Sequence, residues 1–124
     1  MDMMEIAKEL VAGCREGRAK ENLDKLYAAD AVSVEAADMG QGRETHGLDG
    51  IRAKHEWWEG AMEMLEADVT GPMWHGDDRF AVIFRSKVKE TETGKVSDME
   101  EVGIYTVADG KIVREEFFYT YSEV

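Results

Sequence analysis

Two glutamates on neighbouring strands of a predicted hairpin carry the side chains best suited to acid and base chemistry. Residues 99–119 contain two runs rich in β-branched and aromatic residues, and these flank a turn at residues 108–110. In the register that suits this turn, Glu101 and Glu115 are diagonal neighbours on one sheet face. Two carboxylates buried together do not both ionise readily. One of them is therefore expected to hold a proton and donate a hydrogen bond.

The hairpin register follows from the triplet Ala108-Asp109-Gly110, which is typical of a type I turn followed by a left-handed glycine. In this register Val107 faces Lys111. The pairs that follow on the same face are Tyr105 with Val113, Gly103 with Glu115, Glu101 with Phe117, and Met99 with Tyr119. This face therefore mixes aromatic side chains with two carboxylates.

The opposite, convex face of the hairpin is also apolar. It is expected to carry Val102, Ile104, Ile112 and Phe118, beside Arg114 and Glu116. A sheet that is apolar on both sides needs two covers, and we expect helices on one side and a second copy of the chain on the other. The sequence thus predicts a homodimer through the convex face, with the Arg114 and Glu116 pair bridging it.

The elements that must position these side chains are helices first and an antiparallel sheet after. Hydrophobic spacing predicts helices over residues 3–17 and 23–27 and a third from Asp49 to about residue 60, with Ile51, His55, Trp58 and Met62 on one stripe. Strands are predicted at residues 31–35, 65–75, 79–90, 95–107 and 111–121, and residues 36–50 as a loop. The order predicts a single α+β domain over residues 1–124, a cone or roll with a central pocket.

Strand alternation and the third-helix stripe together predict which side chains converge on that pocket. They are Val34, Glu35, His55, Trp58, Phe80, Val82, Phe84, Met99, Glu101, Tyr105, Glu115, Phe117 and Tyr119, with Trp74 as a further polar candidate. Such a lining suits a small apolar or amphipathic ligand.

Composition excludes several classes of partner. The chain has 15 Lys and Arg against 27 Asp and Glu, a net charge of −12, so nucleic acid and anionic membrane surfaces are repelled. No segment approaches the ~20 apolar residues of a membrane span. Cys14, the single cysteine, lies in an apolar helical stripe and is expected to be a core thiol. We expect a cytoplasmic protein.

Metal binding is the other use of a carboxylate and histidine cluster. Glu35, His55, Glu101 and Glu115 are conceivable ligands, but no paired His or Cys motif fixes a ligand spacing. The sequence also lacks a phosphate-binding glycine motif and a nucleophile elbow. We therefore predict neither a metal nor another cofactor.

Four stretches and the order of elements around them together resemble the SnoaL-like branch of the NTF2-like superfamily. The stretches are LYAADAVSVE from Leu26, the helix start at Gly47 through GIRAKH, VTGP from Val69, and DGKIVREEFFY from Asp109. The resemblance covers nearly the whole chain. It implies a strongly bent sheet around a cone-shaped pocket crossed by three helices, and the dimerisation through the outer sheet face that is typical of the superfamily.

The resemblance also implies site residues. Isomerase-like members place a general base at the end of the short first strand, where this sequence has Glu35, and a strand-end carboxylate in an apolar cavity is desolvated and becomes a usable base. The same resemblance places His55 at a pocket position on the third helix, where it can donate to a ligand oxygen or pair with Glu35. The positions of the isomerase's two oxyanion donors are held by Val11 and Gly103, whose side chains cannot donate.

Two functions follow from this pattern. The first is an enzyme of the isomerase or cyclase type that transfers a proton on an apolar carbonyl compound without a cofactor, with Glu35 as base and His55 or a protonated carboxylate as acid. The second is a non-catalytic module that binds a small ligand in the same pocket. The position and desolvation of Glu35 distinguish the two.

Overall fold

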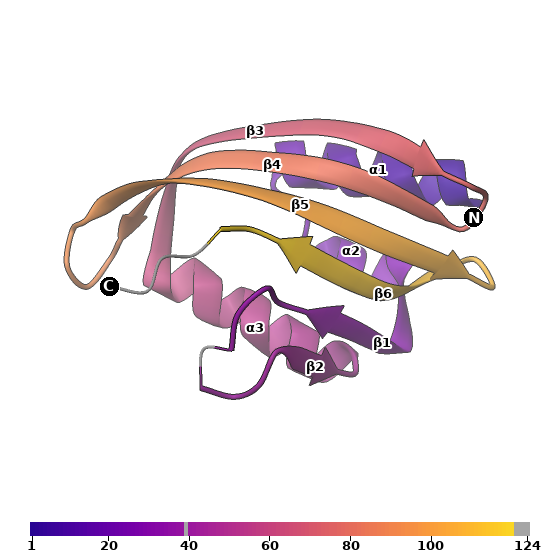
Figure 1. Ribbon diagram of the computed structural model, residues 1–124, viewed down its shortest axis with the longest axis horizontal. Coiled ribbons are helices and arrows are strands. Elements are labelled where there is room, and N and C mark those ends of the chain that lie inside the picture. Colours follow the sequence, from indigo (N-terminus) through magenta and orange to yellow (C-terminus); the bar gives the residue numbers. More distant parts are fainter. Residues whose placement is uncertain (39, 121–124) are drawn as a thin grey trace.

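The structure is a computed structural model that describes residues 1–38 and 40–120, and its core is a six-stranded sheet with three helices (Figure 1). The elements in chain order are α1 (Met3–Glu16), α2 (Glu21–Leu26), β1 (Tyr27–Val34), β2 (Glu44–His46), α3 (Leu48–Ala61), β3 (Met62–His75), β4 (Arg79–Glu90), β5 (Val96–Ala108) and β6 (Lys111–Phe118). This arrangement confirms the predicted α+β roll.

The sheet has the strand order β2-β1-β6-β5-β4-β3 and is bent and open. Its pairs are antiparallel except for β1 with β6, which run parallel. Figure 1 shows α1 lying along the curved strands β3 and β4, while α3 crosses the open side near β1 and β2. The sheet therefore has an inner, concave face toward the helices and an outer, convex face.

Helix α1 is anchored at both ends by its sequence. The Asp2 carboxylate accepts from the Glu5 backbone N–H at 2.8 Å while the Glu5 side chain accepts from the Asp2 N–H at 3.1 Å, a capping box. At the other end Gly17 takes a left-handed conformation with φ 77°. The apolar stripe between these caps packs on the inner face of the sheet, where Phe80 and Ile112 are fully buried.

Several strands differ from the sequence-based expectation, among them β3, which begins at Met62 rather than residue 65. Residues 36–50 were predicted as one loop, but they contain the short strand β2, which pairs with β1 through Val32 and His46. Strand β1 begins at Tyr27 rather than residue 31, directly after α2. The predicted last strand ran to Tyr121, which lies outside the described residues; β6 ends at Phe118.

The predicted hairpin register is wrong by one position at the turn. Asp109 and Gly110 have φ values of 52° and 74°, so they form a two-residue turn of the type I′ class and Ala108 faces Lys111. A bulge at Val113 then adds one residue to β6, and Tyr105 pairs with Glu115.

The bulge decides which side chains share a face. Beyond it the register has moved by two residues, so Glu115 and Phe117 keep the predicted inner orientation beside Tyr105. Between the turn and the bulge, the register differs from the predicted one by one residue. Ile112 therefore lies in the core with no exposed surface, and its predicted place on the convex face is wrong.

Candidate functional site

Five polar side chains meet on the inner face of the sheet, and we call them the inner cluster. They come from the end of β1, from α3, and from strands β5 and β6: Ser33, Glu35, Lys54, Glu101 and Glu115. Alternation along the chain places the first two on the same side. Lys54 follows the fully buried Ile51 by three residues, so the helix presents it to the sheet.

Lys54 is the centre of the hydrogen bonds in the inner cluster. Its Nζ donates to the Ser33 hydroxyl at 2.6 Å and to Glu35 Oε1 at 2.7 Å. The ammonium also lies 5.7 Å from the centroid of the Phe117 ring. The second oxygen of Glu35 accepts from the Tyr119 hydroxyl at 3.1 Å. Glu35 and Lys54 keep 26% and 27% of their side-chain surface exposed, so a ligand can reach this pair from solvent.

Glu115 is the deepest member of the cluster, with 1% exposure. Its Oε2 accepts from the Tyr27 hydroxyl at 2.7 Å, while its Oε1 is buried without a hydrogen-bond partner among the described residues. Burial raises the pKa of Glu115, and this outweighs the opposite effects of Tyr27 and Lys54. The raised pKa favours the protonated, neutral carboxyl group.

Glu101 titrates in a range useful for catalysis. Burial raises its pKa to about 7, and the nearby carboxylates of Glu35 and Glu115 act in the same direction against the opposing charge of Lys54. A carboxyl group with a pKa near neutrality is partly ionised at working pH and can both accept and return a proton.

The aromatic residues predicted for the pocket divide between packed core and site wall. The Tyr105 ring stacks on Phe80 with centroids 5.1 Å apart and meets the edge of Phe117 at 6.2 Å. Phe80 and Val82 are fully buried against α1. Trp74 lies on the edge strand β3, 45% exposed, with its ring 6.4 Å from that of Phe80.

The remaining predicted residues are buried or half-buried, and Met99 lines the hollow on the outer face that is described below. Val34 is buried at the end of β1, and His55, Trp58, Phe84 and Met99 are half-buried on α3, β4 and β5. Burial lowers the pKa of His55, and the charge of Lys54 adds to this effect, so the imidazole is neutral at pH 7. Within residues 1–38 and 40–120, no hydrogen bond joins His55 to Glu35.

The two positions that lack an oxyanion donor have packing roles. Val11 is 3% exposed in the core between α1 and the sheet. At Gly103 an added Cβ would lie 2.9 Å from the Tyr105 ring and 3.2 Å from Phe84, so the glycine leaves space for both aromatic rings. Cys14 also packs against the core, and burial raises the pKa of its thiol to about 11, which keeps it protonated.

Sequence reasoning missed Lys54, Ser33 and Tyr27. The signal for Lys54 is its spacing of three residues from Ile51, which fits a helix stripe as well as the spacing of four that points to His55. The signal for Ser33 is its alternation with Glu35. Tyr27 could not be assigned because β1 starts four residues earlier than its hydrophobic run suggests.

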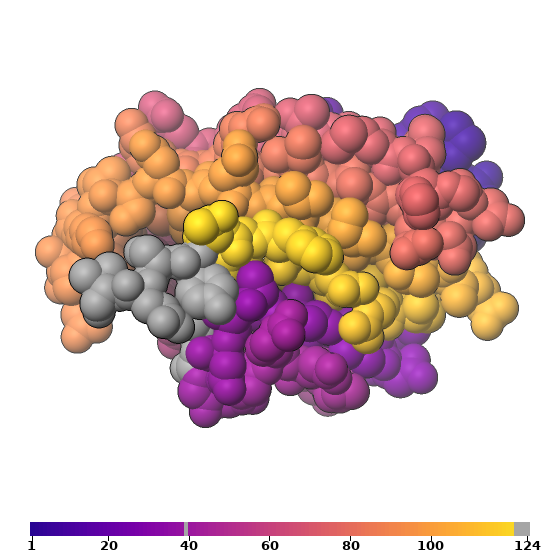
Figure 2. Space-filling model, viewed as in Figure 1, coloured from indigo at the N-terminus to yellow at the C-terminus, as the bar shows by residue number. Residues whose placement is uncertain are grey.

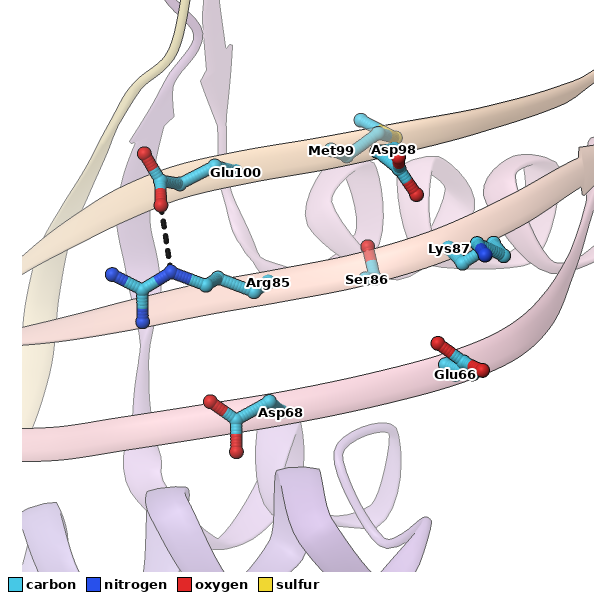
Figure 3. A pocket seen from close by; sticks show the side chains of 8 residues that line it. All are labelled: Glu66, Asp68, Arg85, Ser86, Lys87, Asp98, Met99 and Glu100. Atoms are coloured by element: carbon cyan, nitrogen blue, oxygen red, sulfur yellow. Dashed lines mark hydrogen bonds and ion pairs between the residues drawn. The ribbon is translucent and has the colours of Figure 1, made fainter.

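A hollow of about 400 Å³ lies on the outer face of the sheet. Figure 3 shows its side chains on three adjacent strands, with the helices behind them. In one row Arg85 stands between Asp68 and Glu100, and its Nε lies 2.7 Å from Glu100 Oε2. The groove is lined by Glu66, Asp68, Arg85, Ser86, Lys87, Asp98, Met99 and Glu100. These side chains are mostly exposed and alternate in sign.

The family model of the SnoaL-like domain matches residues 1–119. The chain belongs to the SnoaL-like family. A crystal structure of a candidate SnoaL-like polyketide cyclase from Mesorhizobium loti is 36% identical, covers 96% of this chain and 100% of its own, and superposes with a TM-score of 0.89.

Two solved structures of lower sequence identity share the fold. An NTF2-like protein of unknown function from Burkholderia pseudomallei is 19% identical over 94% of this chain and 89% of its own, with a TM-score of 0.77. A candidate isomerase from Bacillus subtilis is 19% identical over 97% and 90%, with a TM-score of 0.74. Among curated proteins no match is found.

Two further features bear on what this SnoaL-like domain can bind. Across residues 1–38 and 40–120, no three His, Cys, Asp or Glu side chains are grouped so as to hold a metal ion. In the same part of the chain, none of the helices has the length and apolar character needed to cross a bilayer.

Proposed function

We propose that this SnoaL-like domain binds a small carbonyl compound on its inner face and moves a proton on it by general acid–base catalysis. The observation that carries the proposal is Glu101, whose pKa of about 7 results from burial beside two other carboxyl groups. The relative from Mesorhizobium loti is named as a candidate polyketide cyclase, which agrees with this proposal, and also as a carbohydrate phosphatase, which does not.

In the proposed reaction the ionised Glu101 removes a proton from the carbon next to the carbonyl group. The C–H electron pair forms a C=C bond and the carbonyl oxygen gains the negative charge. Protonated Glu101 then returns its proton to the same or a neighbouring carbon. This cycle balances without a cofactor.

Glu35 and His55 have supporting parts in this proposal. Lys54 and Tyr119 occupy both oxygens of Glu35, so we assign it to holding Lys54 rather than to removing the proton. The neutral imidazole of His55 can donate from one ring nitrogen, and we retain it as a second proton donor.

The test is exchange of the α-protons of 1-tetralone in D₂O, followed by proton NMR. We expect the parent protein to accelerate deuterium incorporation and Glu101→Gln to lose it by a factor on the order of 10² or more. The matched control is Glu100→Gln, which makes the same change on the outer face and should leave the rate unchanged. Equal rates for Glu101→Gln and the parent would refute the role of Glu101.

A second candidate function, a binding module without turnover, is favoured by the ion pair of Glu35 and Lys54. A carboxylate held by two donors is a poor base, and the pair can simply orient a ligand. This function predicts saturable binding of 1-tetralone in NMR titrations. Deuterium exchange should then be no faster with the parent or with Glu101→Gln than in buffer alone.

We further propose that two copies pair through their outer sheet faces. Ile83, Val102 and Phe118 are paired neighbours on the adjacent strands β4, β5 and β6, and Phe118 is 56% exposed. Arg114 and Glu116, 3.0 Å apart, lie at the edge of this patch. Sedimentation at micromolar concentration should show a dimer that Phe118→Asp disrupts, whereas a monomeric parent would contradict the proposal.

A further inference from the structure

We infer that Lys54 binds the oxygen of the ligand, and that the ligands of the inner face are planar compounds whose reacting oxygen carries negative charge, as an enolate or a phenolate does. The inference rests on the proposed function and deepens it, because it names the substrate class and the group that recognises it. It starts from the position of one ammonium among three carboxyl groups.

The hydrogen bonds of Lys54 leave room for a ligand. An ammonium group has three N–H donors. Two of them are used by Ser33 and Glu35, at 2.6 and 2.7 Å. The third has no partner among the described residues, and the side chain keeps 27% of its surface exposed. A ligand oxygen can therefore bind Lys54 without breaking either existing bond.

Charge also points to Lys54. Proton removal by Glu101 transfers a negative charge to the ligand oxygen, and this charge needs a donor or a cation close by. Val11 and Gly103 provide neither. The other cations near α3 and β6 are engaged elsewhere, since Arg52 pairs with Asp24 and Arg114 with Glu116.

The walls of the site indicate the shape of the ligand. The Lys54 Nζ stands over the Phe117 ring, and the Tyr105 ring meets that ring edge-on. Tyr105 is buried and supports the Phe117 ring from the core, so a flat, conjugated body can lie against the half-buried Phe117 ring while its oxygen reaches Nζ. Enolates and phenolates have this combination of planarity and a charged oxygen, and Lys54 can donate a hydrogen bond to that oxygen.

The test uses 4-nitrophenol, whose ionised form absorbs visible light, and nitrobenzene, which has a similar shape but no acidic hydroxyl. Titrations at a pH where 4-nitrophenol is ionised should show saturable binding to the parent. Lys54→Met should weaken binding of the phenolate on the order of tenfold or more, because a charge-assisted hydrogen bond is lost, and should leave nitrobenzene binding unchanged. Lys54→Arg should restore most of the phenolate affinity.

The matched control is Lys20→Met, which removes an exposed ammonium that lies 3.3 Å from Glu56 on the outside of α3. It should bind both probes like the parent. If Lys54→Met does not fold, Lys54→Gln removes the charge and keeps a polar side chain of similar reach, with the same expected loss.

Three outcomes would overturn the inference. The first is that the parent shows no saturable phenolate binding. The second is that the parent and the uncharged variants bind phenolate with equal affinity. The third is that the uncharged variants lose affinity for phenolate and nitrobenzene alike, which would give Lys54 only a structural role. Because these are equilibrium measurements, they are independent of turnover. Absence of 1-tetralone exchange together with Lys54-dependent phenolate binding would reject the proposed reaction alone.

Discussion

Glu100 and Glu101 are consecutive residues of β5 that point to opposite faces of the sheet. Glu100 lies on the outer face with 65% of its side chain exposed, and its carboxylate pairs with Arg85 at 2.7 Å. Glu101 lies on the inner face, where burial and two other carboxyl groups raise its pKa to about 7. The same side chain is therefore a solvated surface charge in one position and a largely buried carboxyl group with a raised pKa in the next.

The difference between the two faces extends beyond this pair. On the outer face, acidic and basic side chains alternate across β3, β4 and β5, and water screens them (Figure 3). In the inner cluster the Lys54 ammonium lies among the carboxyl groups of Glu35, Glu101 and Glu115. The Oε1 atom of Glu115 has no hydrogen-bond partner in the described part of the chain. Figure 2 shows strands β4, β5 and β6 side by side on one surface of the molecule. Excess buried charge is typical of sites that bind or react.

The largest effect is expected where the inner face is packed core. Phe80→Ala removes a fully buried ring that touches Trp74 and Tyr105, and we expect it to lower the free energy of unfolding by about 3–5 kcal/mol. Urea unfolding followed by circular dichroism measures this change.

Trp57→Ala is the control for ring removal, because Trp57 is 66% exposed on α3. It should change the free energy of unfolding by no more than about 0.5 kcal/mol. Similar losses in the two variants would mean that the inner face is not the core of the protein.

The next effect concerns the pH dependence of stability. The pKa of Glu101 is raised from 4.5 in the unfolded chain to about 7 in the fold, so its stabilising contribution is complete below pH 4.5 and is lost as the pH rises through about 7. The Glu101→Gln variant has no carboxyl group at this position, so it does not lose this part of its stability as the pH rises. We therefore expect the variant to be more stable than the parent at pH 8, by up to about 3 kcal/mol, and closer to it at pH 4.

Glu100→Gln is the comparison for this titration, and thermal unfolding between pH 4 and pH 8 measures both variants. We expect Glu100→Gln to keep the pH dependence of the parent. Part of the dependence should also remain in Glu101→Gln, because the pKa of Glu115 is raised too. A parent whose stability rises steadily with pH would contradict the assignment of Glu101.

Much of the fold was predictable because alternation and helical spacing are local signals. Glu101, Glu115 and Phe117 lie on the predicted face although the hairpin register was wrong, because the turn and the bulge together moved it by two residues and alternation has a period of two. The two-residue turn moved the register by one position and placed Ile112 in the core instead of on the predicted outer face. The bulge at Val113 was not predictable, because no residue type requires it. The SnoaL-like family was correctly predicted from the order and spacing of its motifs.

The partners within the site were harder to predict than its members. Glu35 was expected as a desolvated base, but which side chain reaches it depends on the rotation of α3 against β1. A rotation of about 100° separates Lys54 from His55 on a helix. The structure places Lys54 at 2.7 Å from Glu35, and sequence spacing alone fits either neighbour.

The smallest expected effect compares one ion pair from each face by double-mutant cycles. Arg85 and Glu100 on the outer face have 51% and 65% of their side chains exposed, and we expect a coupling energy of about 0.2–1 kcal/mol. Glu35 and Lys54 in the inner cluster are half as exposed, so water screens their attraction less and their coupling should be larger. Raising the salt concentration from 0.1 to 1 M shortens the screening length from ~10 to ~3 Å. Most of the outer coupling should then disappear while the inner coupling persists. Equal coupling energies with equal salt dependence would show that the inner cluster is as well solvated as the outer face, and would remove the physical basis for placing a reaction there.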